Sequence, residues 1–240
     1  MGFFDKKYCD ICGEKIGLLG NRKLADGNMC KKCAALLSPW VTDRRSQTLA
    51  EIKEHLAYRE ENKKKVADFN ATRVMGNRTK VFIDEDKGQW LVCDSTKFVD
   101  ANADVLDFSQ VTGCSIDVRE RKQEIYRLDE EQKQVSYFPP RHIYHYDFYI
   151  KITVNSNWFD EINFKVNDSE TDGIGSADYD EAKRTAEEIK TVLTTGRENV
   201  RQTIAQANVP KKSITCPHCG ATTIPDANGR CEFCGGSVNS

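Results

Sequence analysis

Two sets of paired cysteines, one near each end of the chain, constrain its fold more than any other feature. In each set two Cys-x-x-Cys pairs are separated by a short loop, so four thiolates can meet around one tetrahedral metal ion. The eight predicted ligands are Cys9, Cys12, Cys30, Cys33, Cys216, Cys219, Cys231 and Cys234. The sequence therefore predicts a metal-binding module at each end, with a larger domain between them.

Zinc is the metal that we expect in both modules. Four thiolates suit a soft tetrahedral ion, and they leave no open coordination position, so both ions would be structural. Units of about 40 residues or fewer seldom bury enough apolar surface to fold without a cross-link or a metal. An iron centre of the rubredoxin type, redox disulfides and unliganded thiols are the alternatives. His218 lies between two ligands but is predicted to point away, because the four-cysteine set is complete without it.

The composition is that of a soluble protein. The chain has 240 residues, 39% of them apolar and 30% charged, and a formal net charge of −2 gives no general attraction for nucleic acid or an acidic membrane. No apolar run has the length of a signal peptide or a membrane span. We therefore expect a cytoplasmic location. In that reducing compartment metal explains ten cysteines better than disulfides do.

Residues 1–40 are predicted to form a treble-clef-like finger, and residues 41–70 a connecting helix. Asp26-Gly27 indicates a hairpin turn, and helix formers from Ala34 onward follow the last cysteine where a ribbon would have glycine. The connecting helix opens with a capping box at Thr48 and Glu51. Its polar middle, residues 59–65, is expected to face solvent, and His55 to lie on the helix surface.

Residues 71–209 are predicted to form an α+β domain, in which an antiparallel β-sheet or partly open barrel is capped by a C-terminal helix. The clearest strand alternation runs from Tyr144 to Val154. The charged segment 119–141 is expected to be an excursion from the sheet for most of its length, with residues 125–128 as its strand candidate. Helical spacing returns over residues 179–207, with a kink or a break predicted at Thr194-Thr195-Gly196. A linker then leads to a zinc ribbon at residues 210–240.

No catalytic motif appears in the sequence, so we expect a protein that is not an enzyme and has no catalytic or cofactor-binding residues other than the metal ligands. Cys93 and Cys114 are interpreted as core thiols of the predicted strands. His142 and His145 are three residues apart in a predicted strand, which places them on opposite faces and argues against a shared metal. The aromatic run Tyr144, Tyr146 and Phe148 is interpreted as core rather than as a platform for bases.

Three segments carry resemblances to known families. Residues 9–20 (CDICGEKIGLLG), 23–27 (KLADG) and 30–33 (CKKC) resemble an uncharacterised bacterial family, a domain of unknown function common in Gram-positive bacteria. This resemblance implies a four-cysteine zinc module with no established activity. The central region is similar in pattern to bacterial pleckstrin-homology or GRAM-like domains. Residues 216–234 are similar to zinc ribbons of bacterial regulatory and membrane-associated proteins.

These features predict a zinc-binding cytosolic adaptor or regulator that presents its surfaces to another protein. Two alternatives are nucleic-acid binding through the first finger and lipid binding through the pleckstrin-homology-like domain. The first is suggested by an excess of basic over acidic side chains in residues 5–32. The sequence leaves the partner and the oligomeric state open.

Overall fold

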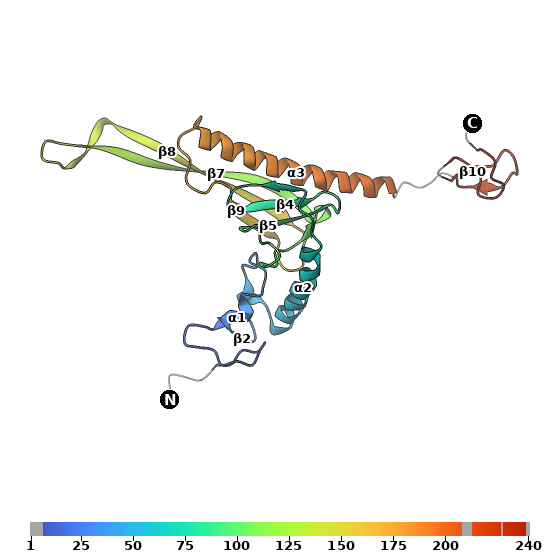
Figure 1. Cartoon of the computed structure of the whole chain (residues 1–240), viewed down its shortest axis with the longest axis horizontal. Helices are drawn as coiled ribbons and strands as arrows, with labels where there is room; N and C mark the ends of the chain where they lie inside the picture. The colour runs from blue at the N-terminus through green and yellow to red at the C-terminus, as the bar shows by residue number, and fades with distance from the viewer. Residues whose placement is uncertain (1–6, 208–212, 227, 239–240) are drawn as a thin grey trace. The chain divides into compact units, whose positions relative to one another are not determined.

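The structure is a computed structural model that describes residues 7–207, 213–226 and 228–238 (Figure 1). The chain divides into two units, residues 1–198 and residues 199–240. The first unit mixes helices with several antiparallel sheets, and no sheet in the described part of the chain closes into a barrel.

The first unit begins with a small hairpin and two helices. Strands β1 (Arg22–Lys23) and β2 (Asn28–Met29) form the predicted hairpin around Asp26-Gly27. Helix α1 (Lys31–Ala34), a 3₁₀ turn η1 (Arg44–Ser46) and helix α2 (Leu49–Ala67) follow. The predicted capping box of α2 is confirmed, because Thr48 Oγ1 accepts from the Glu51 N–H and the Thr48 N–H donates to the Glu51 carboxylate. The Asp26 carboxylate accepts from the Leu49 N–H at 2.7 Å and so ties the hairpin to the start of α2.

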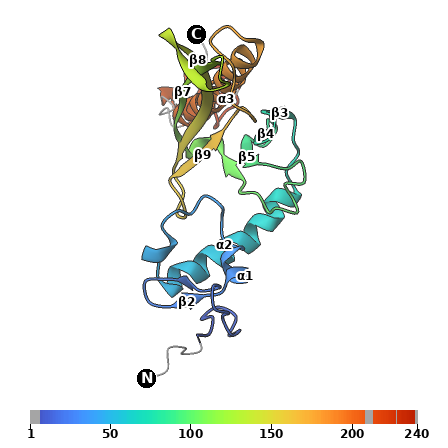
Figure 2. The ribbon, with the colours of Figure 1, turned by 90° about the vertical axis from the view of Figure 1, so that its left-hand side faces the viewer.

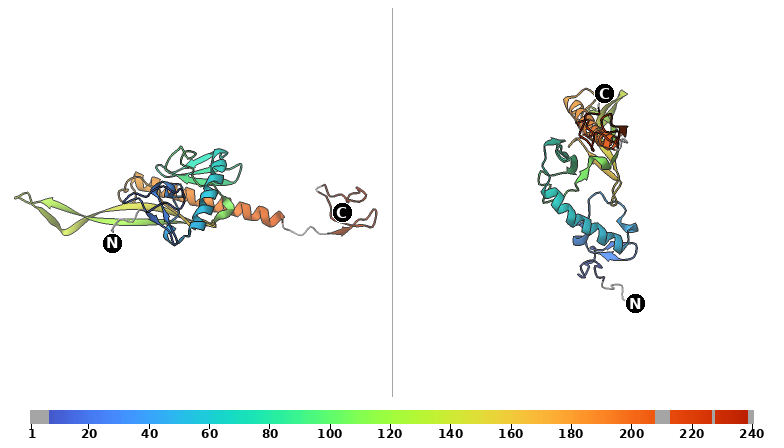
Figure 3. Two further views of the ribbon diagram at one scale, coloured as in Figure 1. Left: turned by 90° about the horizontal axis from the view of Figure 1, so that it is seen from below. Right: turned by 90° about the vertical axis from the view of Figure 1, so that its right-hand side faces the viewer.

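A four-stranded antiparallel sheet follows α2. Its strands are β3 (Arg73–Met75), β4 (Lys80–Asp84), β5 (Gln89–Cys93) and β6 (Leu106–Asp107), in that spatial order. Phe82 and Leu91 on one face pack against Val66 and Phe69 at the end of α2. Helix α2 therefore lies between the β1–β2 hairpin and this sheet, as Figures 2 and 3 show.

A 3₁₀ turn, η2 (Phe108–Gln110), leads into a three-stranded antiparallel sheet. Its strands are β7 (Val111–Leu128), β8 (Gln134–Val154) and β9 (Glu161–Lys165), with β8 in the centre. The alternation predicted for β8 is confirmed, since every second residue from Tyr146 to Val154 is buried. The same set includes Tyr146 and Phe148, which the sequence placed in the core. The core prediction is wrong for Tyr144, whose side chain is 37% exposed because β9 does not extend beside it.

The prediction that residues 119–141 form an irregular excursion for most of their length is wrong, because most of them continue the strands β7 and β8. β7 and β8 stay paired as far as Leu128 and Gln134, whereas β9 pairs with β8 only between Tyr149 and Thr153. Residues 119–145 thus form a two-stranded arm that extends beyond the sheet (Figures 1 and 3). Charged side chains suit a ribbon with water on both faces. The register shift after Ile125 leaves Pro139 and Pro140 outside the pairing between β7 and β8.

Helix α3 (Ala177–Ala207) covers the buried face of the three-stranded sheet. The ring of Tyr179 packs edge-on against Tyr146 and Phe148. Of the kink or break predicted at Gly196, the break is wrong, because α3 continues through this residue. A Cβ atom at Gly196 would lie 2.5 Å from the ring of Phe108, so glycine allows close packing at this position.

The second unit contains the end of α3 and a small ribbon. Strands β10 (Ile214–Thr215) and β11 (Thr222–Thr223) pair antiparallel, and Cys216, Cys231 and Val238 form its core. Within the described ranges, no helix combines the length and apolar character that crossing a bilayer requires.

Candidate metal centres

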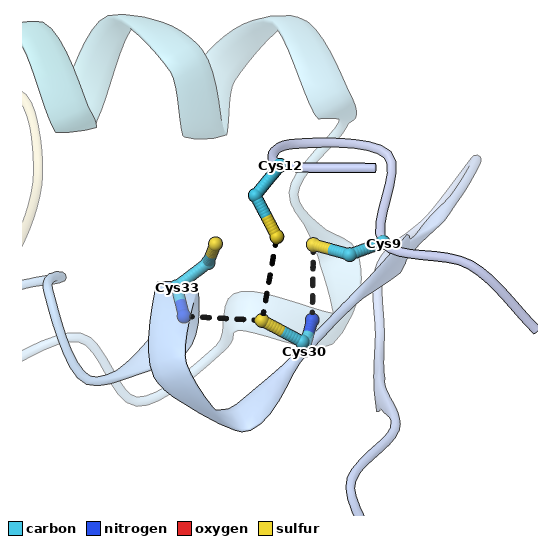
Figure 4. A group of neighbouring side chains, drawn as sticks. All are labelled: Cys9, Cys12, Cys30 and Cys33. Carbon is cyan, nitrogen blue, oxygen red and sulfur yellow. Dashed lines mark hydrogen bonds between the residues drawn. The ribbon is translucent and has the colours of Figure 1, made fainter. Parts of the chain in front are cut away.

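The first four-cysteine group is assembled from two separate turns of chain (Figure 4). Its four Sγ atoms, from Cys9, Cys12, Cys30 and Cys33, lie within 4.8 Å of one another, and those of Cys12 and Cys30 are 3.8 Å apart. A tetrahedral ion with metal–sulfur bonds of about 2.3 Å places its sulfur ligands about 3.8 Å apart. A disulfide would require about 2.0 Å. The spacing therefore fits a metal ion, and all four cysteines are free of disulfide bonds.

Backbone N–H groups point at the sulfurs of this group. The Cys30 N–H donates to Cys9 Sγ at 3.2 Å, and the Cys33 N–H donates to Cys30 Sγ at 3.4 Å. Burial alone would raise the pKa of Cys9, but hydrogen bonds from the backbone of Cys12, Cys30 and Ile11 lower it to about 6. Burial and the neighbouring sulfurs raise the pKa of Cys33 well above its ordinary value.

The second four-cysteine group repeats this arrangement in the ribbon. Cys216 Sγ and Cys234 Sγ are 3.6 Å apart, and Cys219 Sγ and Cys231 Sγ are 3.8 Å apart. Backbone hydrogen bonds from Cys234 and Phe233 outweigh burial and lower the pKa of Cys231 to about 6. The Gly236 backbone favours the Cys234 thiolate, yet the sulfurs of Cys219 and Cys216 raise the pKa of Cys234 to about 12.

In both groups, therefore, the thiols differ in how easily they ionise. Each contains one thiol that ionises easily and another whose ionisation is opposed by its neighbouring sulfurs. A divalent cation among the four sulfurs removes this conflict, because it attracts every thiolate and offsets their mutual repulsion. The donor set and the spacing thus suit a soft tetrahedral ion with no open coordination position.

The two groups differ in how the chain turns around the sulfurs. Gly13, Gly220 and Gly235 each follow a Cys-x-x-Cys pair with φ between 70° and 75°, a left-handed conformation that suits glycine. The remaining pair, Cys30 and Cys33, is followed by Ala34 instead of glycine. Its Cys30 side chain caps the start of α1 by accepting from the Cys33 N–H. The sequence predicted a helix at Cys30 and Cys33, and α1 confirms it. The helix ends at Ala34, which is earlier than the helix formers after Cys33 suggest.

The remaining candidate residues lie outside both groups. His218 Nε2 is 3.1 Å from the Ser237 carbonyl oxygen and is not among the clustered ligand atoms, as the sequence indicated. Cys93 and Cys114 are both half-buried free thiols. Burial raises the pKa of Cys114 to about 11, which keeps this thiol protonated and unreactive. His142 and His145 belong to no ligand cluster in the described residues.

Sequence reasoning missed a buried polar network beside the first group. Arg59 Nη1 lies 2.6 Å from Asp104 Oδ1, and the two side chains are only 6% and 1% exposed. Arg59 Nε also donates to the carbonyl oxygen of Leu36, and Ser38 Oγ donates to Asp104 Oδ2 at 2.8 Å. The chain just after Cys33 is thus bonded both to α2 and to the segment that precedes β6.

The middle of α2 does not face solvent on all sides, so that prediction is wrong for the buried residues Arg59 and Asn62. The prediction that His55 lies on the helix surface is also wrong. Asn62 is fully buried, with its amide donating to the Ala103 carbonyl and accepting from the Val105 N–H. His55 is also fully buried and stacks on Trp158, with ring centroids 4.9 Å apart. One signal could have identified this face. Residues 52, 55, 59, 62 and 66 follow the three- and four-residue spacing of a helical stripe.

The His55 ring is held as a neutral acceptor. The Ser38 N–H donates to its Nε2 at 3.4 Å, which leaves the proton on Nδ1. Burial, and then the charge of Arg59, lower the pKa of His55 to about 4. His55 therefore stays uncharged near neutral pH and links the segment after the first metal group to α2.

Together the two groups define a protein with two closed four-sulfur sites that can each hold one metal ion. Residues 7–55 match the family described as Domain of unknown function (DUF4428). This match confirms, for the first module, the predicted relation to a domain-of-unknown-function family. No curated protein and no solved structure matches the chain.

Proposed function

We propose that this chain is a zinc-binding cytosolic adaptor without enzymatic activity, which holds two structural zinc ions and binds another protein. The sulfur spacings of 3.6 to 3.8 Å support zinc, because they match the edge of a tetrahedron with zinc–thiolate bonds of about 2.3 Å. A set of four thiolates has no position for a substrate, so the two ions would hold the modules in shape.

The observation that carries the adaptor proposal is the arm. Two-stranded ribbons are only marginally stable in water, yet this one continues far beyond the sheet. It also exposes large apolar side chains, and that of Phe138 is completely exposed. The others are Tyr126, Leu128, Ile143 and Tyr144. Aromatic residues and unpaired strand edges are features through which proteins bind other proteins.

The central domain supports a finer proposal, a pleckstrin-homology-like or GRAM-like fold. Four antiparallel strands, β3 to β6, are followed by three, β7 to β9, and then by helix α3. This order is what the sequence resemblance leads us to expect. In this proposal the arm is an extension of the second sheet that serves as the site for the partner.

Affinity capture from the native cell tests the proposed function. One variant replaces residues 121–145 by an Asn-Gly turn, and a second carries Phe138→Ser with Tyr144→Ser. Ile174→Ser is the matched control, since that side chain is 72% exposed but lies outside the arm. We expect a specific protein that is lost with both arm variants and kept by the control. Retention of the same proteins without the arm, or substrate turnover by the purified chain, would contradict the proposal.

A further inference from the structure

The first finger carries two adjacent leucines that the structure leaves in solvent. Leu18 and Leu19 are 81% and 89% exposed. They occupy the two central positions of a tight turn, which the Gly20 N–H closes by donating to the Gly17 carbonyl at 3.0 Å. Ile16, next to this turn, is buried in the core around the metal ligands. The turn is therefore anchored at its base and presents its two largest side chains outward.

A group of arginines lies beside this turn. The guanidinium of Arg22 donates to the backbone carbonyls of Leu19 and Asn21. Arg44 and Arg45 belong to the 3₁₀ turn η1, which contacts strand β1. Burial, and then the charges of Arg22 and Arg45, lower the pKa of Arg44. In addition, Arg44 Nε is buried and has no hydrogen-bond partner among the described residues.

The acidic side chains of the same finger are engaged elsewhere. Glu14 pairs with Lys32, and Asp10 accepts from the Asn28 N–H. Asp26 accepts from the Leu49 N–H. In the described part of the chain, no ion pair joins an acidic side chain to any of the three arginines, and their mutual repulsion therefore favours an anion from outside.

We propose that the first finger docks reversibly on an anionic bilayer surface, with Leu18 and Leu19 entering the interfacial region and Arg22, Arg44 and Arg45 facing the lipid phosphates. Apolar side chains next to cationic ones are the two components of peripheral membrane binding. A nucleic acid would also attract the arginines, but single strands are bound by aromatic stacking, and this turn is aliphatic. Leucine is likewise under-represented among the residues that dominate protein interfaces.

Vesicle co-sedimentation of the full chain tests this proposal, with phosphatidylcholine vesicles compared with mixed phosphatidylcholine and phosphatidylserine vesicles. We expect binding only to the anionic vesicles, and weaker binding as added salt shortens the screening length. Leu18→Ser with Leu19→Ser should lower the partition coefficient at least about tenfold, because less apolar surface enters the interface. Arg45→Glu should lower it about fivefold or more, because a cation near the surface becomes an anion.

Two controls separate this surface from the rest of the molecule. Ile174→Ser removes an apolar side chain that is 72% exposed in another loop, and Lys63→Glu reverses an exposed charge on α2. Both should bind vesicles like the unmodified chain, and all variants should keep their metal content. The proposal fails if the unmodified chain does not bind anionic vesicles, or if the leucine variant binds as well as the unmodified chain. It also fails if the chain binds a duplex oligonucleotide but no vesicle, and Arg45→Glu abolishes that binding.

Discussion

Arg59 and Asp104 form an ion pair that is almost completely removed from solvent, with 2.6 Å between Arg59 Nη1 and Asp104 Oδ1. Arg59 comes from the middle of α2 and Asp104 from the segment before β6. Burial raises the pKa of Asp104, although the charge of Arg59 opposes this effect. The pair joins the metal-binding finger and the central sheet, because its two members also bond to Leu36 and Ser38.

We expect Arg59→Met to lower the free energy of unfolding by about 3 to 5 kcal/mol, because it leaves the Asp104 carboxylate buried without its partner. Arg59→Met with Asp104→Leu should cost less than the single change, since no isolated charge remains. Urea denaturation of the metal-loaded protein measures both. Lys63→Met is the control, because its ion pair with Glu60 on the same helix is exposed and should contribute little. Equal losses for the Arg59 and Lys63 variants would contradict this prediction.

The buried His55 should make stability depend on pH. Its pKa is about 4 in the folded protein, below the ordinary value of 6.5, so the unfolded chain binds the proton more readily between these values. The contribution of the neutral ring is therefore complete above about pH 6.5 and decreases as the pH falls towards 4, by about 3 kcal/mol in total. His55→Gln keeps an acceptor for the Ser38 N–H and should remove this dependence.

Denaturation of the unmodified chain and of His55→Gln at a series of pH values checks this expectation. The difference between the two proteins isolates His55, because the other titrating groups are common to both. Burial raises the pKa of Asp104, so the contribution of Asp104 to the pH dependence of stability has the opposite sign to that of His55. Because Asp104 is present in both proteins, this contribution cancels in the comparison. A difference that does not change between pH 6.5 and 4 would contradict the assignment.

Loss of the two metal ions should have unequal effects on the first unit. Cys9→Ser with Cys12→Ser should lower the metal content from two ions per chain to one, consistent with two groups of ligands. It should also lower the melting temperature of the first unit by about 5 °C or more, because Leu36 and Ser38 are held both by the metal-binding turn and by the buried network. Cys216→Ser with Cys219→Ser should lower the metal content equally but leave that melting temperature unchanged.

Elemental analysis and tryptophan fluorescence distinguish these outcomes. The three tryptophans, Trp40, Trp90 and Trp158, all belong to the first unit, so their emission reports its unfolding and not that of the ribbon. Trp158 stacks directly on His55, so its emission should respond to changes in the network. Identical melting curves for the two double variants would show that the first metal centre does not support the central domain.

Gly196→Ala should destabilise the protein, although alanine favours helices over glycine by about 1 kcal/mol. The added Cβ would lie 2.5 Å from the ring of Phe108, so the ring or the helix must move, at a cost of about 1 to 3 kcal/mol. Phe108→Leu with Gly196→Ala should recover part of this loss relative to the single change. Thermal unfolding of the single and double variants tests the packing, and a more stable Gly196→Ala protein would contradict it.

Several parts of the structure could be predicted because one local rule decided them. The cysteine spacing identified all eight clustered sulfurs, and Thr48 with Glu51 identified the start of α2. The alternation of β8 placed Phe148, Ile150 and Ile152 in the core. In each case the residues needed are close in sequence, and their side-chain chemistry has one dominant use.

Other parts depend on neighbours that a local pattern does not contain. Arg59 and Asn62 look like solvent-facing residues of a polar helix until Asp104 and Ala103, some 40 residues later, supply their partners. The arm was missed because charged residues with two prolines are typical of a loop, and pairing with the opposite strand decides its structure. Gly196 indicated a break because the ring that fills the space beside it comes from a distant turn.

The position of α2 bears on where the first module can be separated from the rest of the chain. The family match ends at residue 55, whereas α2 runs from Leu49 to Ala67. A cut at residue 55 would divide the helix between its capping box and Arg59. It would also leave the Asp104 carboxylate in the remaining part without its cationic partner. Transplanting this finger into another protein should therefore require the whole helix, together with a surface that replaces Asp104 and the residues around it.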